Sequence, residues 1–121
     1  MKQRSIAGIC LLAVATCHLS CSPVRAFEKK FKRVSEGMLA PQVIAILGEP
    51  DGRSTKSIPK ENTRTPVMML KQFLSPGTEY AEWTYLRGDM RYLVWLSSEY
   101  PKPGGKLAVI LKSSYPADAV F

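Results

Sequence analysis

The feature that most constrains the fold is a set of three alternating apolar runs in the second half of the chain. The first run spans Tyr80–Arg87 and the second spans Met90–Ser98, with a Gly-Asp turn between them. The third run, Lys106–Tyr115, follows the segment Tyr100–Gly105, which is rich in proline and glycine. Side chains that alternate with a period of two are typical of strands. Because the connections are short, the sequence predicts a three-stranded antiparallel meander.

The alternation also predicts which side chains share a face of each strand. A shift of one residue would move every side chain to the other face, so the pattern fixes the orientation of the strand. The predicted faces are Ala81, Trp83 and Tyr85 against Glu82, Thr84 and Leu86; Tyr92, Val94 and Leu96 against Leu93 and Trp95; and Leu107, Val109 and Leu111 against Ala108, Ile110 and Lys112.

Two short helices are predicted before the strands. Phe27, Phe31 and Val34 fall at helical spacing, which favours a first helix over residues 28–34. A second helix is predicted over Ala40–Leu47, with an apolar face made by Val43, Ile44 and Leu47 and a stop signal made by Gly48 and Pro50. The expected fold class is therefore α+β, with two short N-terminal helices packed on a three-stranded antiparallel meander in two layers.

Residues 52–78, between the helices and the strands, are predicted to form a long loop. Prolines and glycines interrupt the segment at Gly52, Pro59, Pro66, Pro76 and Gly77. Within it, Thr65-Pro66 can begin a helix of one to two turns, on which Val67, Leu70 and Leu74 would share a face. Loops this long in a small domain are usually functional.

The N-terminal segment has the pattern of an export signal. Lys2 and Arg4 precede an apolar run from Ile6 to Thr16, which is 11 residues long. Crossing a bilayer needs ~20 residues, so the run is too short for a transmembrane helix. A basic start, a short apolar run and small residues are typical of a secretory signal. We therefore expect residues 1–26 to be a signal peptide or lipoprotein signal, and residues 27–121 to form a single domain.

The sequence leaves the site of processing open. Cys21 follows Ser20 and is the first candidate for lipidation, with Cys17 as the second. Ordinary signal-peptidase cleavage after Ala26 is equally compatible with the residues. We accordingly expect an exported protein that is either periplasmic or anchored by a lipid at the outer membrane.

The rest of the chain offers little for catalysis. From Phe27 onward there is no cysteine and no histidine, which excludes thiol nucleophiles, imidazole bases and most transition-metal sites. Glu79 and Glu82 are three residues apart on a predicted strand and so lie on opposite faces, as a solvated strand edge. Glu49 and Asp51 are interpreted as polar residues of a turn. We expect no enzyme activity, no catalytic or metal-binding residue, no cofactor and no small-molecule substrate.

The charge distribution selects one segment as a candidate contact surface. The chain carries a net charge of +7, which permits a nucleic-acid partner without requiring one, and we expect none. Basic and acidic residues balance within residues 27–51 and within residues 79–121. Residues 52–78 hold one acidic residue, Glu61, against five basic ones: Arg53, Lys56, Lys60, Arg64 and Lys71. The sequence thus predicts contact with an envelope protein or an anionic membrane surface, with a solubilising loop as the alternative.

Several short motifs resemble the SmpA/OmlA (BamE-like) lipoprotein family. They are Gly37-Met38, then Val43, then Leu47-Gly48-Glu49-Pro50, and later Trp83-Thr84-Tyr85. The resemblance implies a β-lactamase-inhibitor-like fold of two helices and a three-stranded sheet, and a role as a scaffold in outer-membrane protein assembly or in envelope maintenance. Leu39 departs from the family, which usually has Thr or Ser at this helix cap. The motif residues carry the fold more than the function.

The same two-layer fold leaves a second function open, that of a secreted inhibitor of a hydrolase. Aromatic side chains exposed on an open sheet face would favour it, because Tyr and Trp dominate binding hot spots. The candidates are Trp83, Tyr85, Tyr92 and Trp95. A small hydrolase is the third hypothesis, which would need a deep polar pocket.

Overall fold

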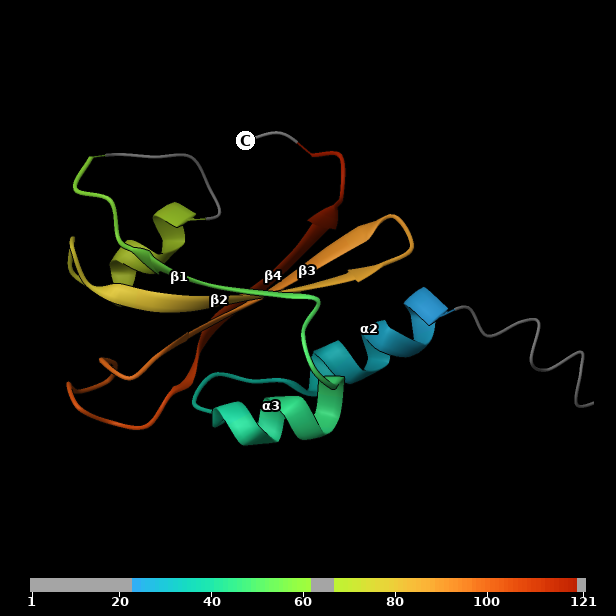
Figure 1. Cartoon of the computed structure of the whole chain (residues 1–121), viewed down its shortest axis with the longest axis horizontal. Coiled ribbons are helices and arrows are strands. Elements are labelled where there is room, and N and C mark those ends of the chain that lie inside the picture. The colour runs from blue at the N-terminus through green and yellow to red at the C-terminus, as the bar shows by residue number, and fades with distance from the viewer. Residues whose placement is uncertain (1–22, 62–66, 120–121) are drawn as a thin grey trace, which may run out of the picture.

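The fold is α+β, as the sequence predicts, and it contains a four-stranded antiparallel sheet. A computed structural model describes residues 23–61 and 67–119 (Figure 1). Its elements are helices α2 (Pro23–Arg33) and α3 (Ala40–Leu47), strand β1 (Gly52–Ser57), the 3₁₀ helix η1 (Val67–Gln72), and strands β2 (Glu79–Arg87), β3 (Met90–Ser97) and β4 (Ala108–Pro116). The strand order is β1-β2-β3-β4. Cys17, Cys21 and Arg64 lie outside the described residues.

Strand β1 corrects both the predicted three-stranded sheet and the predicted long loop. It pairs with β2 along its whole length, from Gly52 opposite Thr84 to Ser57 opposite Glu79. Every residue of β1 is exposed, so the strand has no apolar alternation that a sequence pattern could reveal. Charged and polar residues on an edge strand also discourage pairing with other chains. The segment predicted as a loop thus contributes a strand as well as the short helix η1.

Helix α2 begins earlier than the sequence pattern indicates. It starts at Pro23, within the segment assigned to the export signal, and proline is well tolerated in a first helical turn. Phe27 and Phe31 are buried, as their spacing predicts. Helix α3 has the predicted bounds. Its N-cap residue, Leu39, supplies no side-chain bond, and the side chain of Gln42 instead accepts the Leu39 N–H at 2.8 Å.

Apolar residues cover both faces of the sheet. On one face a cluster joins Phe27 and Phe31 of α2 and Val43 and Leu47 of α3 to the sheet residues Trp83, Tyr85, Tyr92, Val94, Leu96 and Val109. On the other face a second cluster joins Leu70 and Leu74 to Ile58, Tyr80, Leu93, Trp95 and Ile110. Figure 1 shows α2 and α3 on the opposite side of the sheet from η1. We call these two sides the helix side and the η1 side.

The central strand β3 is therefore buried on both faces, from Tyr92 to Leu96. The predicted division of its side chains between the two faces is confirmed. Tyr92, Val94 and Leu96 belong to the helix-side cluster, and Leu93 and Trp95 belong to the η1-side cluster. A strand that is covered on both sides has no free apolar face to offer a ligand.

A bulge in β4 overturns part of the predicted alternation. Val109 lies opposite Leu96 and Leu111 lies opposite Trp95, so Ile110 is an extra residue. Because one extra residue reverses the faces that follow it, Leu111 packs on the η1 side and Lys112 reaches the helix side. The Lys112 Nζ lies 4.9 Å from the centre of the Phe31 ring and donates to the Phe31 carbonyl at 2.6 Å.

The connection between α2 and α3 covers part of the outer edge of β4. The Gly37 N–H donates to the Val109 carbonyl at 2.8 Å, and the Val109 N–H donates to the Met38 carbonyl at 2.8 Å. The Ala40 N–H donates to the Leu107 carbonyl at 3.0 Å. Gly37 has a φ of 90°, a conformation that L side chains rarely adopt, so glycine is needed at this position. The backbone of Gly37 and Met38 thus forms hydrogen bonds along the outer edge of β4 near its start.

The first turn of α2 makes a contact that can be tested by substitution. A Cβ at Gly88, in the β2–β3 turn, would lie 2.5 Å from Cγ2 of Val24, and Gly88 has a φ of 57°. We expect Gly88→Ala to lower the free energy of unfolding by at least about 2 kcal/mol, from backbone strain and the clash together. In a Val24→Ala background the same substitution should cost about 1 kcal/mol less, measured by denaturant unfolding. Equal costs in both backgrounds would show that Val24 does not pack against the turn.

Candidate functional site

Four of the five basic residues predicted as a contact surface are described by the structure, and they are distributed over several elements. Arg53 and Lys56 lie on β1, Lys60 follows β1 and is exposed, and Lys71 lies on η1. The structure brings Lys60 and Lys71 to the same region, because the Lys71 Nζ donates to the carbonyl of Glu61 at 2.7 Å.

Two of these cations form ion pairs inside the domain. The Arg53 guanidinium pairs with Glu49 and lies 4.8 Å from the centre of the Trp83 ring. The Lys56 Nζ lies 3.1 Å from a carboxylate oxygen of Glu82. Both cations hold the edge strand β1 to its surroundings, and their charges are partly neutralised. They are therefore weaker candidates for an external contact than their sequence positions suggest.

Glu82 is a structural carboxylate and not the solvated strand edge that the sequence indicates. Its side chain is only 13% exposed, because β1 covers the edge of β2. One oxygen accepts the Trp95 Nε1–H at 3.1 Å while the other pairs with Lys56. Glu82 thus satisfies the polar atom of a fully buried tryptophan.

Asp51 connects the start of β1 to the end of β2. Its carboxylate accepts the Leu86 N–H at 2.7 Å and a bond from Arg87 Nη1 at 2.8 Å. The Leu86 bond, followed by the Arg87 hydrogen bond and charge, holds the pKa of Asp51 below its ordinary value of 3.8. Arg87 also lies 4.7 Å from the centre of the Phe27 ring, so the pair reaches α2.

The motif residues that carry the family resemblance have structural roles in the fold. Gly48 follows α3 with a φ of 86°, and its carbonyl accepts the Tyr85 hydroxyl at 2.9 Å. Burial raises the pKa of Tyr85 to about 12, so this hydroxyl stays protonated and able to donate. Val43 and Trp83 are buried, and Met38 packs against the same cluster. Pro50 follows in the connection to β1.

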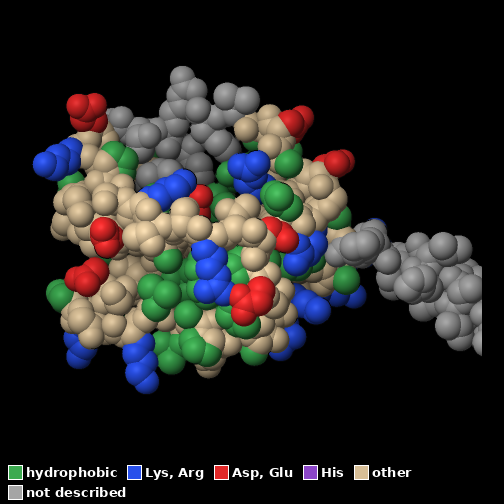
Figure 2. Space-filling view, viewed as in Figure 1, with side chains coloured by type: hydrophobic (Ala, Val, Ile, Leu, Met, Phe, Trp, Pro, Cys, Tyr) green, Lys and Arg blue, Asp and Glu red, His purple; other side chains and the backbone are tan. Residues whose placement is uncertain are grey.

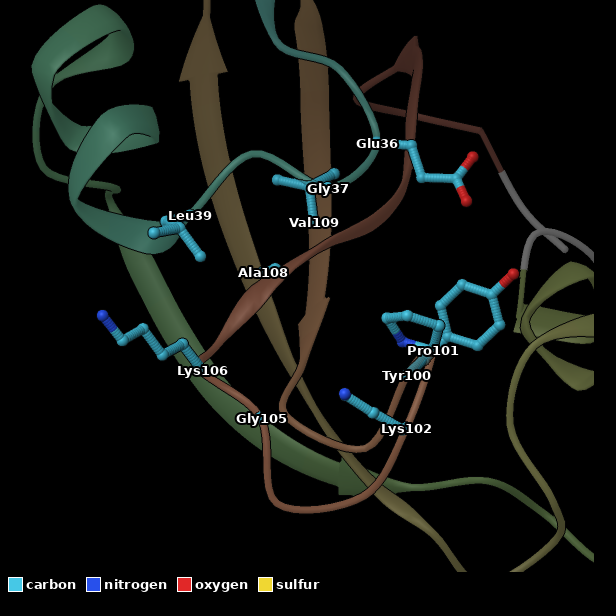
Figure 3. Close-up of a pocket in the computed structure, with 10 residues that line it drawn as sticks. All are labelled: Glu36, Gly37, Leu39, Tyr100, Pro101, Lys102, Gly105, Lys106, Ala108 and Val109. Atoms are coloured by element: carbon cyan, nitrogen blue, oxygen red, sulfur yellow. The ribbon is translucent and has the colours of Figure 1, made fainter.

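A groove of about 560 Å³ lies between the α2–α3 connection and the β3–β4 loop (Figure 3). Its charged side chains are Glu36, Lys102 and Lys106, and the Tyr100 ring also lines it. Figure 3 shows the three charged side chains on separate walls, pointing in different directions. A general acid and a base would have to converge on one substrate atom, and these three charged side chains are not directed at a common point (Figure 3).

The basic outer face of α2 is a surface that the sequence prediction missed. The helix holds five basic residues, Arg25, Lys29, Lys30, Lys32 and Arg33, against the single acidic residue Glu28, and all six are exposed. The sequence pattern places Arg25 in the predicted export signal, and residues 27–51 hold equal numbers of basic and acidic residues, so no excess charge points to this helix. The balancing residues Glu49 and Asp51 pair instead with Arg53 and Arg87. Extending the helical periodicity upstream of Phe27 would have revealed this face.

Two further features are absent from the part of the chain that the structure describes. Among residues 23–61 and 67–119 there is no group of three His, Cys, Asp or Glu side chains that could hold a metal ion. Within the same ranges, no helix has the length and apolar character needed to cross a membrane.

Comparisons with known proteins give no match. No model of a protein family, no curated protein and no solved structure is similar enough to this chain to be matched. The SmpA/OmlA resemblance therefore stays a prediction that rests on the motif residues alone.

The Asp51 interactions predict a specific dependence of stability on pH. Because the folded-state pKa of Asp51 is lowered, its contribution is present above pH 3.8 and is lost as the pH falls through the lower, folded-state value. Asp51→Asn should lower the free energy of unfolding at neutral pH by about 1 kcal/mol or less, since the pair is exposed. The difference from the parent should vanish in strong acid. Asp118→Asn is the matched control, and an equal effect there would contradict a specific role for Asp51.

The Glu82 contacts predict a split between two substitutions. Glu82→Ala removes the acceptor of the Trp95 N–H and should lower the free energy of unfolding by about 1–3 kcal/mol. Glu82→Gln keeps an oxygen acceptor and loses only the Lys56 ion pair, so it should cost about 1 kcal/mol or less. Denaturant unfolding followed by tryptophan fluorescence measures both. Equal losses would show that the ion pair, and not the buried N–H, governs the effect.

Proposed function

We propose that this protein is a non-enzymatic, exported envelope protein that acts as a binding or scaffold module through its outer surface. The observation that carries the proposal is an apolar patch on η1, where Met68 is 41% exposed and Met69 is 37% exposed. Lys71 lies on the same helix, and its bond to Glu61 brings the segment that contains Lys60 beside it. We call Met68, Met69, Lys60 and Lys71 the η1 surface.

An exposed methionine pair bordered by lysines suits a protein partner with an apolar, acidic surface. Methionine side chains are flexible and polarizable, and they adapt to irregular contacts. The flanking ammonium groups would orient an acidic partner and make the association sensitive to salt. Of the residues predicted to make this contact, the proposal retains Lys60 and Lys71. Arg53 and Lys56 instead form ion pairs within the domain.

Export and the envelope location rest on the sequence. The basic start and the 11-residue apolar run support a signal, and the motifs at Gly37-Met38, Leu47–Pro50 and Trp83–Tyr85 support a family of envelope lipoproteins with two helices packed on one sheet face. We propose on these grounds a periplasmic protein, or one anchored through Cys21 at the outer membrane, in outer-membrane protein assembly or envelope maintenance.

The inhibitor alternative has no observation in its favour. It needs aromatic side chains exposed on an open sheet face, and Trp83, Tyr85, Tyr92 and Trp95 are all buried. Since the sheet is covered on both sides, a target enzyme would meet loops and helices and not these rings.

The partner contact is tested by crosslinking in the envelope of a cell that produces the full chain with a C-terminal tag. We expect the tagged protein in the envelope fraction, crosslinked to one specific partner, and we expect Met68→Asp with Met69→Asp to abolish that crosslink. The matched control is Leu86→Asp, at another exposed apolar side chain (48% exposed) away from η1, which should keep it. A solitary monomer, a cytosolic location or an unchanged crosslink in the methionine variant would each contradict the proposal.

A further inference from the structure

The outer face of α2 carries a regular row of cations. Arg25, Lys29, Lys32 and Arg33 follow the spacing i, i+4, i+7 and i+8, which places them on one side of a helix. Phe27 and Phe31 are buried on the opposite side against the sheet. At 1.5 Å per residue the row is about 12 Å long. Figure 2 shows Lys and Arg side chains along the part of the surface where α2 emerges.

This row does not serve the stability of the helix. Like charges at i, i+3 and i+4 repel, and Lys29 has such neighbours on both sides. The cations of the last turn, Lys30, Lys32 and Arg33, interact favourably with the helix dipole, but Arg25 lies in the first turn, where the dipole disfavours a cation. The first turn contains no acidic residue to compensate. The row is therefore a surface suited to an external anion.

No acidic group of the domain neutralises the centre of the row. Within the described residues, Lys29, Lys32 and Arg33 take part in no ion pair. The only acidic residue of α2 is Glu28, and it is directed toward Tyr92, whose pKa is raised by burial and, to a smaller extent, by the charge of Glu28. The other cations that contact α2, Arg87 and Lys112, point into the domain, toward Asp51 and the Phe31 carbonyl.

The shape of the row and its position in the chain indicate which kind of anion would bind there. A straight row on a rigid helix fits a flat surface, and a shallow depression of about 260 Å³ between Arg25, Ala26, Lys29 and Lys30 has room for a phosphate group. The helix also begins only six residues after the apolar run that ends at Thr16. Where a lipid on Cys21 or Cys17 holds the chain, the start of α2 at Pro23 lies within a few residues of the bilayer. Basic segments in this position are attracted to anionic lipids.

We propose that α2 lies flat on an anionic membrane surface, with Lys29, Lys32 and Arg33 against the lipid phosphates. The proposal rests on the proposed envelope location. It also gives the domain an orientation, because η1 lies on the opposite side of the sheet from α2 (Figure 1). The η1 surface then faces away from the membrane, where a protein partner can reach it.

The test measures binding of the full chain to vesicles of phosphatidylcholine with and without phosphatidylglycerol, at low and at physiological salt. The apolar run adds equally to both kinds of vesicle, so the ratio of the two partition coefficients isolates the anionic contact. Each cation near an anionic surface contributes about fivefold. The variant K29Q/K32Q/R33Q should therefore lower the ratio by about a hundredfold at low salt and by less at physiological salt, where screening acts over ~8 Å. Its thermal unfolding should lie close to that of the parent, because the lost interactions of Lys32 and Arg33 with the helix dipole offset the repulsion that is removed.

The matched control is K102Q/K106Q, which is compared with K29Q/K32Q and removes the same charge from exposed lysines outside both α2 and the η1 surface. We expect this control to keep most of the anionic preference of the parent. An equal loss in both variants would mean that net charge alone matters and would overturn the proposal, as would a larger loss in the control or no loss in either variant. The vesicle result is independent of export and of the η1 contact. The vesicle experiment can therefore fail while the crosslinking experiment succeeds, and the crosslinking experiment can fail while the vesicle experiment succeeds.

Discussion

The contact between the aromatic side chains of α2 and the β2–β3 hairpin is the interaction on which the rest of the structure depends. The Phe27 ring centre lies 4.8 Å from that of Tyr92 and 5.4 Å from that of Tyr85, and the Phe31 ring lies 5.0 Å from Tyr92. Such pairs add about 0.5–1.5 kcal/mol each beyond the area they bury. Because two rings one turn apart fix the rotation of the helix, they also determine which side chains of α2 point outward.

The helices and the three apolar strands could be predicted because each buries side chains at the period of its own backbone. The alternation of β3 survives since both of its faces are packed, from Tyr92 to Leu96. Strand β1 could not be predicted, because it buries nothing and is held through its backbone, Arg53 and Lys56. The bulge at Ile110 was equally hidden, since a single extra residue in β4 leaves the local composition unchanged while it exchanges the faces of Leu111 and Lys112.

Charge on the surface was harder to predict than the core, because summing charges along the sequence loses their positions in space. Residues 27–51 are neutral in sum, yet Glu49 and Asp51 pair with cations of β1 and β2, and within the described residues Lys29, Lys32 and Arg33 form no ion pair. Residues 52–78 are basic in sum, yet Arg53 and Lys56 are engaged within the domain. Among the predicted contact residues that the structure describes, Lys71 lies on η1 with the exposed methionines, and its bond to the Glu61 carbonyl brings the segment that contains Lys60 near this helix.

The magnitudes explain how the domain can carry a row of like charges on a short helix. An isolated helix of 11 residues is marginal in water, and each like-charged pair in the row lowers its stability by about 0.2–0.5 kcal/mol. Burying the two phenylalanines contributes about 1.5–3 kcal/mol each, which outweighs the few repulsive pairs. The Lys112 bond to the Phe31 carbonyl and the Arg87 contact with Phe27 hold the inner side further. The packing of α2 on the sheet therefore supplies the stability that the like charges remove, so the helix can keep an exposed row of cations.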